Sequence, residues 1–187
     1  MGKARIKDKN FELYIPEETI RGRVHAVARQ ISADMDGKCP LLLGVLNGAF
    51  IFAADLIREM SISCEISFVK LASYQGTTST GKVREIIGVN EDLRGRTVII
   101  VEDVVESGHT MRQMVESLGT RAPASVHVCT LLLKPGHEDF PFEIEYVGFK
   151  VPKDFVVGYG FDYDGEGRQL RDIYRLVPDG SADVAER

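Results

Sequence analysis

The feature that most constrains the fold is a run of apolar residues broken only by one glycine, Leu41-Leu42-Leu43-Gly44-Val45-Leu46. A strand with one face in water alternates polar and apolar side chains, whereas a strand buried on both faces reads as a continuous apolar run. Residues 98–101 and 126–133 are also largely apolar. Strands buried on both faces belong to parallel sheets that helices cover on each side. The sequence therefore predicts an α/β domain built on a mainly parallel sheet.

Segments with helical spacing of apolar residues separate these strands. Such segments begin at Pro16 and end at Asp36-Gly37, run over residues 49–60, and run from residue 111 to Gly119. Further strands are expected at residues 62–71 and 84–89, and the chain from Lys134 onward, with its prolines, glycines and aromatic residues, is predicted to cap the sheet. Alternating strands and helices predict a doubly wound sheet, in which ligands bind at the carboxyl ends of the strands.

Composition excludes several classes of function. The 187 residues contain 23 Lys and Arg against 28 Asp and Glu, a net charge of −5, which argues against a broad nucleic-acid surface. The most apolar stretch, residues 41–56, is interrupted by Asn47, two glycines and Asp55, so no membrane span is expected. The first residues lack the apolar core of a signal peptide, which favours a cytoplasmic protein.

The cysteines support the same location. The chain contains 3 of them, Cys39, Cys64 and Cys129, far apart and without a CxxC pair. Buried free thiols in a reducing compartment are expected, rather than disulfides or a zinc site.

Residues 98–110 carry the most informative motif. A buried strand runs into Glu102-Asp103, and Ser107, Gly108 and Thr110 follow at the expected start of a helix. Hydroxyls, glycine and a helix N-terminus together suit a phosphate group, while adjacent carboxylates suit sugar hydroxyls or a divalent cation. The motif therefore favours a ribose phosphate, although Glu106 or Ser107 acting only as a helix cap would be the simpler explanation.

A second glycine motif is misleading. Residues 76–82 match the spacing of a P-loop, but Val83 follows where a Ser or Thr hydroxyl is needed, and the next residues resemble a strand rather than a helix. We do not expect a nucleoside triphosphate site there.

Taken in order along the chain, these motifs resemble the hypoxanthine (hypoxanthine-guanine) phosphoribosyltransferases of the type I phosphoribosyltransferase family. The resemblance rests on residues 46–50, Ser73-Tyr74 with Ser79-Thr80-Gly81, residues 98–110, Lys134, and residues 155–163 with Arg168. It implies the type I phosphoribosyltransferase fold as one domain over residues 1–187. The core would span roughly residues 38–150, and a small hood would form from roughly residues 1–20 and 151–187.

The resemblance also implies a reaction: transfer of the 5-phosphoribosyl group of phosphoribosyl pyrophosphate (PRPP) to a 6-oxopurine, with Mg²⁺ as cofactor and release of pyrophosphate. Relatives carry a non-proline cis peptide after Leu46, and they form homodimers or homotetramers. They usually have Asp where Glu106 stands and often Lys where His109 stands.

The implied residue roles fall into four groups. Catalytic roles fall to Glu106, Tyr74, Ser73 and Arg168. The expected PRPP-binding residues are Leu46, Asn47, Gly48, Glu102, Asp103, Val104, Val105, Glu106, Ser107, Gly108, His109 and Thr110. The expected purine-binding residues are Lys134, Phe155, Val156 and Asp162, and the expected metal ligands are Glu102, Asp103 and Asp162.

Two alternatives remain at this point. The same fold serves non-catalytic, PRPP-sensing regulators, which would need a nucleic-acid surface that the acidic composition does not favour. Transfer to adenine or a pyrimidine is disfavoured by Lys134, because an ammonium donor suits the O6 acceptor of a 6-oxopurine and not an amino group.

Overall fold

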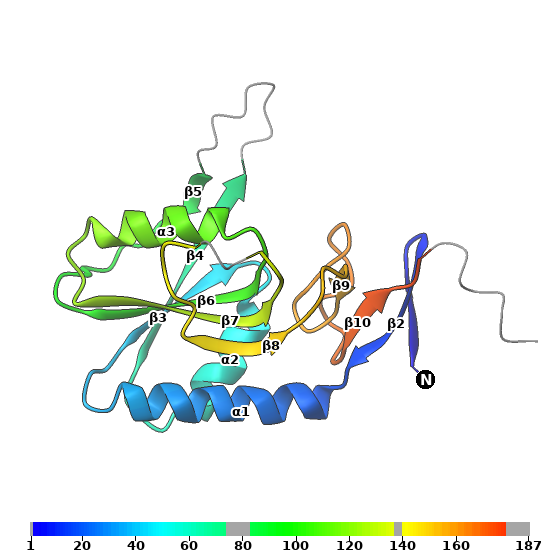
Figure 1. Ribbon diagram of the computed structural model, residues 1–187, viewed down its shortest axis with the longest axis horizontal. Helices are drawn as coiled ribbons and strands as arrows, with labels where there is room; N and C mark the ends of the chain where they lie inside the picture. Colours follow the sequence, from blue (N-terminus) through cyan, green and yellow to red (C-terminus); the bar gives the residue numbers. More distant parts are fainter. Residues whose placement is uncertain (1, 74–82, 137–139, 179–187) are drawn as a thin grey trace, which may run out of the picture.

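The computed structural model describes residues 2–73, 83–136 and 140–178. Within these residues the chain forms a six-stranded sheet in the order β5-β4-β3-β6-β7-β8 and a four-stranded sheet in the order β1-β2-β10-β9. Figure 1 shows the two sheets side by side, with the smaller one built from both ends of the chain.

The main sheet is parallel except at one edge. Its strands are β3 (Leu41–Leu46), β4 (Glu65–Ser73), β5 (Val83–Ile87), β6 (Thr97–Val105), β7 (Ser125–Leu133) and β8 (Tyr146–Lys150). Only the β4–β5 pair is antiparallel. The predicted doubly wound, mainly parallel sheet is confirmed.

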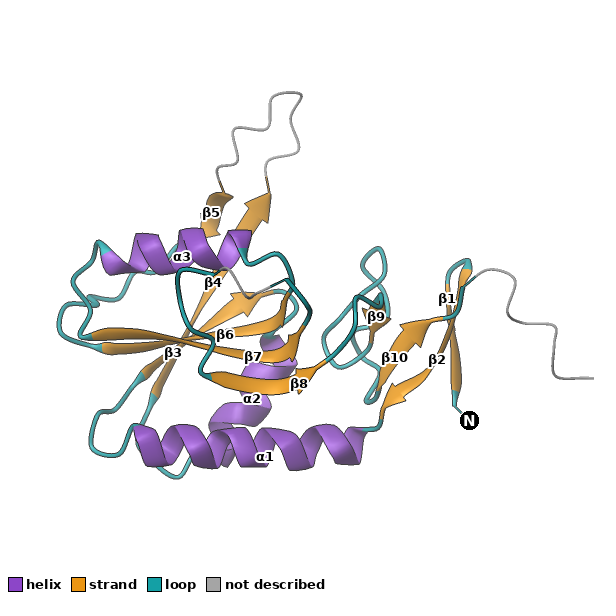
Figure 2. Ribbon diagram, viewed as in Figure 1, coloured by secondary structure: helices purple, strands orange, loops and turns teal. Residues whose placement is uncertain are grey.

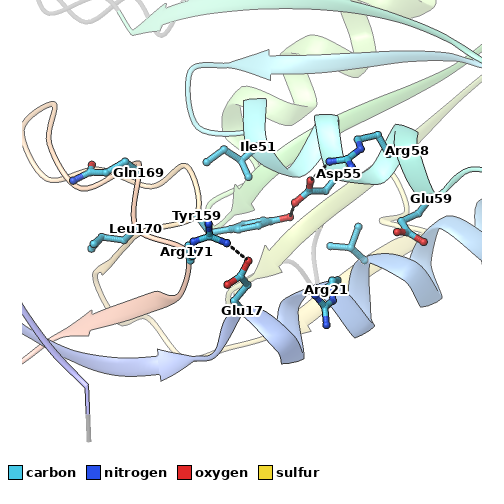
Figure 3. A pocket seen from close by; sticks show the side chains of 11 residues that line it. Glu17, Arg21, Ile51, Asp55, Arg58, Glu59, Tyr159, Gln169, Leu170 and Arg171 are labelled. Carbon is cyan, nitrogen blue, oxygen red and sulfur yellow. Dashed lines mark hydrogen bonds and ion pairs between the residues drawn. The ribbon is translucent and has the colours of Figure 1, made fainter.

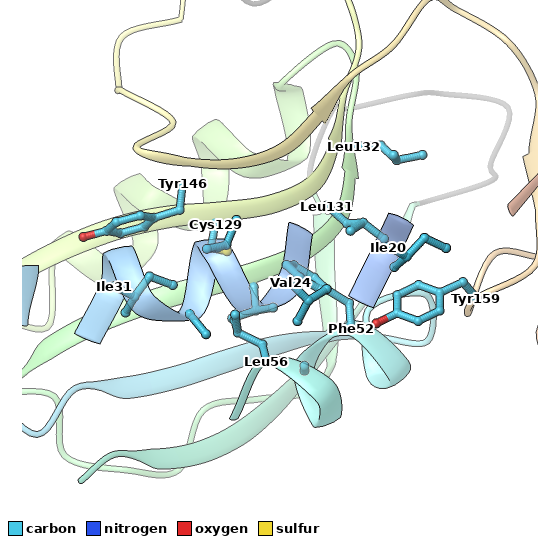
Figure 4. Packing of buried hydrophobic residues seen from close by; sticks show 14 of the residues in the cluster. Ile20, Val24, Ile31, Phe52, Leu56, Cys129, Leu131, Leu132, Tyr146 and Tyr159 are labelled. Carbon is cyan, nitrogen blue, oxygen red and sulfur yellow. The ribbon is translucent and has the colours of Figure 1, made fainter. Parts of the chain in front are cut away.

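Helices cover both faces of this sheet, as the apolar run at residues 41–46 predicts. The helices are α1 (Glu17–Asp34), α2 (Phe50–Glu59) and α3 (His109–Gly119), and Figure 2 shows α3 on the face opposite α1 and α2. Leu42 belongs to the buried cluster that includes the α1 and α2 side chains seen in Figure 4, whereas Leu41 and Leu43 belong to the cluster that includes those of α3. Successive residues of one strand thus enter two different cores, which leaves no room for a polar side chain in β3.

We call the smaller sheet, together with the segment that joins β9 to β10, the hood. The sheet consists of β1 (Lys3–Ile6), β2 (Lys9–Ile15), β9 (Val156–Val157) and β10 (Ile173–Leu176), all paired antiparallel. Phe11 and Val157, both fully buried, form its small core with Ile6. Because β2 leads directly into α1 and β9 follows soon after β8, the hood lies close to the main sheet (Figure 1).

Three sequence expectations need correction. The segment after Lys134 does not only cap the sheet, since β8 joins it as a parallel strand beside β7. The strand expected at residues 62–71 begins later, at Glu65. Cys39 is exposed rather than buried, whereas Cys129 is buried and all three cysteines are free thiols.

Across the described ranges no helix combines the length and apolar character needed to cross a membrane.

Candidate active site

Two turns meet at the carboxyl edge of the main sheet. One follows β3 and leads through Asn47 and Gly48 into α2, and its Leu46–Asn47 peptide is cis. The other follows β6 and leads into α3. They touch closely, because a Cβ atom on Gly48 would overlap the carboxylate of Asp103. Only a glycine can occupy this position without a shift of the acid.

The acids Glu102 and Asp103 lie inside β6 rather than at its end, because the strand continues to Val105. Asp103 Oδ1 accepts the N–H of Val104 at 2.9 Å, and Glu102 Oε1 accepts the N–H of Asp103 at 3.1 Å. Burial raises the pKa of Glu102 well above its usual value, and the neighbouring Asp103 charge raises it further. Burial also raises the pKa of Asp103, while hydrogen bonds and the charge of Arg168 oppose the shift. The pair is therefore reluctant to carry two negative charges without a cation nearby.

The Glu102 and Asp103 carboxylates can be compared with the ligands that the implied Mg²⁺ would need. Among the described residues, no three His, Cys, Asp or Glu side chains are arranged to hold a metal ion. Mg²⁺ usually takes one or two carboxylates and completes its shell with water and substrate phosphates. A pair of adjacent acids with raised pKa values, at the sheet edge where a phosphorylated sugar would lie, fits that pattern.

Asp162 is engaged differently from this pair. Its Oδ1 atom lies 2.6 Å from Nη2 of Arg168, and its Oδ2 atom accepts the N–H of Gly165 at 2.7 Å. Arg168 also donates to the carbonyl of Gly160 at 2.5 Å. The predicted metal ligand Asp162 is thus held by an arginine in this structure.

The turn after β6 encloses a small polar hollow. A cavity of about 180 Å³ is lined by Glu102, Val104, Val105, Glu106, Ser107, Gly108, His109, Thr110 and Met111. Gly108 immediately precedes α3 and has a positive φ of 64°, a conformation that side chains disfavour. The first N–H groups of a helix have no partner inside it and favour a bound anion. The hollow is therefore suited to a phosphate, and the residue before the helix is Gly108, not Glu106 or Ser107 acting as a cap.

Lys134 lies next to this hollow. It follows β7, and its backbone N–H donates to the Val105 carbonyl at 2.9 Å. Its residue is only 9% exposed, and its Nζ atom lies 3.2 Å from Oε2 of Glu106, whose side chain is half exposed. The structure thus brings together a buried ammonium and an accessible carboxylate that the sequence separates.

Phe155 presents an apolar surface from the hood. The residue is 46% exposed, and its ring packs at 6.4 Å from Phe11 and edge-on at 5.9 Å from Tyr163, measured between ring centroids. Val156, the next residue, is buried in β9. An exposed ring backed by other aromatics is a suitable surface for a planar ligand.

Part of the predicted site is not described. Tyr74 and residues 79–81 lie outside the described residues, and Ser73 is placed only as the last residue of β4, paired with Val83 of β5.

The structure also adds contacts that the sequence did not reveal. The Tyr159 hydroxyl donates to Asp55 of α2 at 2.7 Å, beside a cavity of about 310 Å³ between α1, α2 and the hood (Figure 3). A Cβ atom on Gly160 would overlap the Gly48 carbonyl. Tyr159 thus joins the hood to α2 and Gly160 joins it to the turn after β3. In the sequence, only the Gly-Tyr-Gly pattern indicated a special backbone there.

Comparison with known proteins agrees with this geometry. The model of the phosphoribosyl transferase domain matches residues 17–164. The hypoxanthine phosphoribosyltransferase of Salmonella typhimurium is 40% identical over 169 residues, which cover 89% of this chain and 95% of that protein. The hypoxanthine-guanine phosphoribosyltransferase of Mycobacterium avium is 43% identical over 168 residues, which cover 86% and 83%.

A solved structure shows the same fold. The hypoxanthine phosphoribosyltransferase of Trypanosoma cruzi, in complex with the product IMP, superposes with a TM-score of 0.84 at 36% identity and covers 95% of this chain and 99% of that one. The chain belongs to the phosphoribosyltransferase family and, within it, to the hypoxanthine phosphoribosyltransferases.

Proposed function

We propose that this protein is a purine salvage enzyme that transfers the 5-phosphoribosyl group of PRPP to a 6-oxopurine, giving a nucleoside monophosphate and pyrophosphate. Hypoxanthine is the expected acceptor, with IMP as product, and guanine or xanthine are candidates for further acceptors. The observation that carries this proposal is the Lys134–Glu106 pair beside the phosphate-sized hollow. On a free 6-oxopurine that carries a proton at N7, the O6 acceptor and the N7–H donor lie side by side on one edge, so a neighbouring ammonium and carboxylate match that edge.

In this proposal the turn from Glu106 to Thr110 holds the 5-phosphate. Its backbone N–H groups and the α3 N-terminus supply positive potential without a cationic side chain. Ser107 and Thr110 are exposed and add hydroxyl donors. His109 is exposed beside them, so we expect its replacement of the common Lys to be tolerated. Val104 and Val105 line the hollow by their position in β6.

The ribose and pyrophosphate would lie between the two turns. Glu102 and Asp103 are assigned to the ribose hydroxyls and to Mg²⁺, with Asp162 as the remaining candidate ligand. The backbone of Leu46, Asn47 and Gly48 is assigned to the pyrophosphate, together with Arg168. Bound Mg²⁺ would supply charge neutralisation for the departing pyrophosphate.

The purine would lie between Phe155 and Lys134. The Phe155 ring offers a stacking surface, the Lys134 ammonium donates to O6, and backbone groups of Val156 and Asp162 meet the remaining edge. Glu106 is assigned to the proton at N7, as a general base or as a stabiliser of that proton in flight. Ser73 and Tyr74 are assigned to the exclusion of water, which would otherwise consume the sugar cation.

Steady-state assays with hypoxanthine, guanine, xanthine and adenine, each with PRPP and Mg²⁺, test the proposal. Turnover with at least one 6-oxopurine and none with adenine is the expected result. Binding of PRPP without turnover of any purine would overturn it in favour of the PRPP-sensing regulator, which the comparisons do not support.

The proposal extends to location and assembly. The three free thiols are those expected in a reducing compartment, which supports the cytoplasm. We propose a single functional domain that assembles as a homodimer or homotetramer from protein subunits alone, with no nucleic-acid or membrane partner. Light scattering on the purified protein tests the assembly.

A further inference from the structure

An aromatic side chain lies against the phosphate turn from outside the residues assigned to binding. Phe140 belongs to the segment between β7 and β8, which also begins with Lys134. Its ring tip points at Gly108, because a Cβ atom on Gly108 would overlap the Cζ, Cε1 and Cε2 atoms of the ring. The contact therefore joins the β7–β8 connection to the first residue before α3.

Gly108 is constrained in two independent ways. It is buried, and its positive φ of 64° sets the direction in which the chain enters α3. Its carbonyl accepts the N–H of Arg112 at 2.8 Å, which starts the helix. Any tilt of Gly108 would therefore redirect the N–H groups of the neighbouring turn, which line the hollow.

The Phe140 ring is itself anchored. It stacks on Phe142 with 5.2 Å between ring centroids and an interplanar angle of 26°. Both rings are partly buried and pack on the core formed by β3, β6, β7 and α3, which includes Leu133 and Met111. Because this core holds the Phe140 ring in place, the ring cannot move with Gly108 if the turn relaxes. It therefore limits the movement of Gly108.

We propose that Phe140 is a positioning residue for the ribose 5-phosphate: its ring fixes the Gly108 turn so that the backbone donors converge on the phosphate. This inference rests on the proposed function. It separates the ligands of the enzyme into two classes. PRPP and the nucleotide product carry a 5-phosphate and depend on Phe140, whereas pyrophosphate and the free purine do not.

The test compares Phe140→Ala, which removes the ring at Gly108, with Phe142→Ala, which removes the neighbouring ring that stacks on Phe140 and should cost less affinity. Calorimetry with Mg²⁺ present gives the Kd values of PRPP and IMP, and the reverse reaction at saturating IMP gives the KM of pyrophosphate. A misplacement of about 1 Å can cost about 100-fold in an enzyme site. We expect Phe140→Ala to raise the Kd values of PRPP and IMP by about 10-fold or more. The KM of pyrophosphate should change by less than about twofold.

Two further variants keep the result decisive. Phe140→Leu retains apolar volume but removes the ring tip over Gly108, so it should show the same ligand pattern with a smaller loss even if Phe140→Ala is poorly folded. Gly108→Ala should reproduce the loss of PRPP and IMP affinity by displacing the turn directly.

Unchanged Kd values in Phe140→Leu and Phe140→Ala would overturn the inference. So would an equal loss for pyrophosphate, or an equal loss in Phe142→Ala, because either result would indicate general loosening of the β7–β8 connection. If the wild-type protein bound neither PRPP nor IMP, the proposed function would fail and this inference with it, whereas normal wild-type binding with unaffected variants defeats the inference alone.

Discussion

The Nζ atom of Lys134 lies 3.2 Å from the Oε2 atom of Glu106, although the two residues come from different connections of the sheet. Glu106 is the first residue after β6, and Lys134 is the first residue after the neighbouring parallel strand β7. The pairing of these strands therefore creates a cation–carboxylate contact at the carboxyl edge. Each group is proposed to meet the purine, and substitutions of the two should have distinct kinetic signatures.

Glu106→Gln should retain most PRPP binding and lose catalysis. Removing a general base lowers turnover by about 10²- to 10⁴-fold, and an amide of the same size keeps the local packing. Steady-state kinetics and PRPP calorimetry on the same preparation measure both quantities. Glu106→Asp, which restores the residue usual in relatives, is the control and should remain active. Wild-type turnover in Glu106→Gln would refute the role assigned to the carboxylate.

Lys134→Ala should impair the purine side of the reaction. A hydrogen bond to a charged group contributes about 1.5–3 kcal/mol, so the KM for hypoxanthine should rise by about 10- to 100-fold. The Kd of PRPP should change much less. Lys150→Ala is a matched control, since Lys150 ends the adjacent strand β8 and is exposed. Equal losses for PRPP and hypoxanthine would contradict the O6 assignment.

The main sheet was largely predictable because its strands are buried on both faces. The continuous run at residues 41–46 became β3 with the expected bounds, since no other short element hides so many consecutive apolar side chains. The strand β8 was missed because it is short, Gly148 interrupts its apolar residues, and Glu143 and Glu145 come directly before it. A glycine is needed there because a Cβ atom on Gly148 would overlap the Leu131 carbonyl of the neighbouring strand.

The site was predictable by residue type but not by contact. The glycine and acids that follow the apolar run at residues 98–101 indicated a phosphate and sugar site, and Glu102, Glu106 and Gly108 do line the hollow. Contacts such as Phe140 against Gly108, or Tyr159 with Asp55, join distant parts of the chain. No local periodicity encodes such pairs, since they exist only once the sheet and hood have formed.

Gly48→Ala should disable the turn after β3. The added methyl group would overlap the Asp103 carboxylate, so either the turn or the acid must move. We expect a loss of kcat/KM for PRPP of about 100-fold, the scale of a roughly 1 Å displacement in a catalytic site. Steady-state kinetics with varied PRPP measure it.

Gly22→Ala is the control for this substitution. Gly22 is exposed in α1, and a Cβ atom there would meet nothing within 4 Å. Alanine in a helix should stabilise the protein by up to about 1 kcal/mol and leave turnover unchanged. Equal activity of the two alanine variants would show that the Gly48–Asp103 contact is unimportant.

Glu102→Gln should stabilise the free protein in a pH-dependent manner. Burial and Asp103 raise the pKa of Glu102 in the folded state, so the folded protein holds its proton to a higher pH than the unfolded chain. Stability from this group is therefore complete below the ordinary Glu pKa of about 4.3 and is lost as pH rises through the folded-state pKa. The variant avoids that loss.

Thermal unfolding of both proteins at a series of pH values tests this effect. The melting temperature of Glu102→Gln should exceed that of the wild type near neutral pH by a few degrees, and the difference should shrink as the solution is made acidic. Mg²⁺-dependent PRPP affinity should fall in the same variant. A difference in melting temperature that does not depend on pH would contradict the assigned cause.

Phe155→Ala should weaken purine binding without weakening the fold. Because Phe155 is 46% exposed, removal of its ring leaves no closed cavity, and the melting temperature should stay close to that of the wild type. Stacking of a base on an aromatic ring contributes about 1–3 kcal/mol, so the KM for hypoxanthine should rise by about 5- to 100-fold. Phe155→Tyr keeps a stacking ring and should restore the wild-type KM.

Phe11 packs against the Phe155 ring but is fully buried, so Phe11→Leu should mainly lower the melting temperature rather than raise the KM for hypoxanthine. If Phe155→Ala lowered the melting temperature and left the KM for hypoxanthine unchanged, Phe155 would be a structural residue of the hood and not part of the purine site.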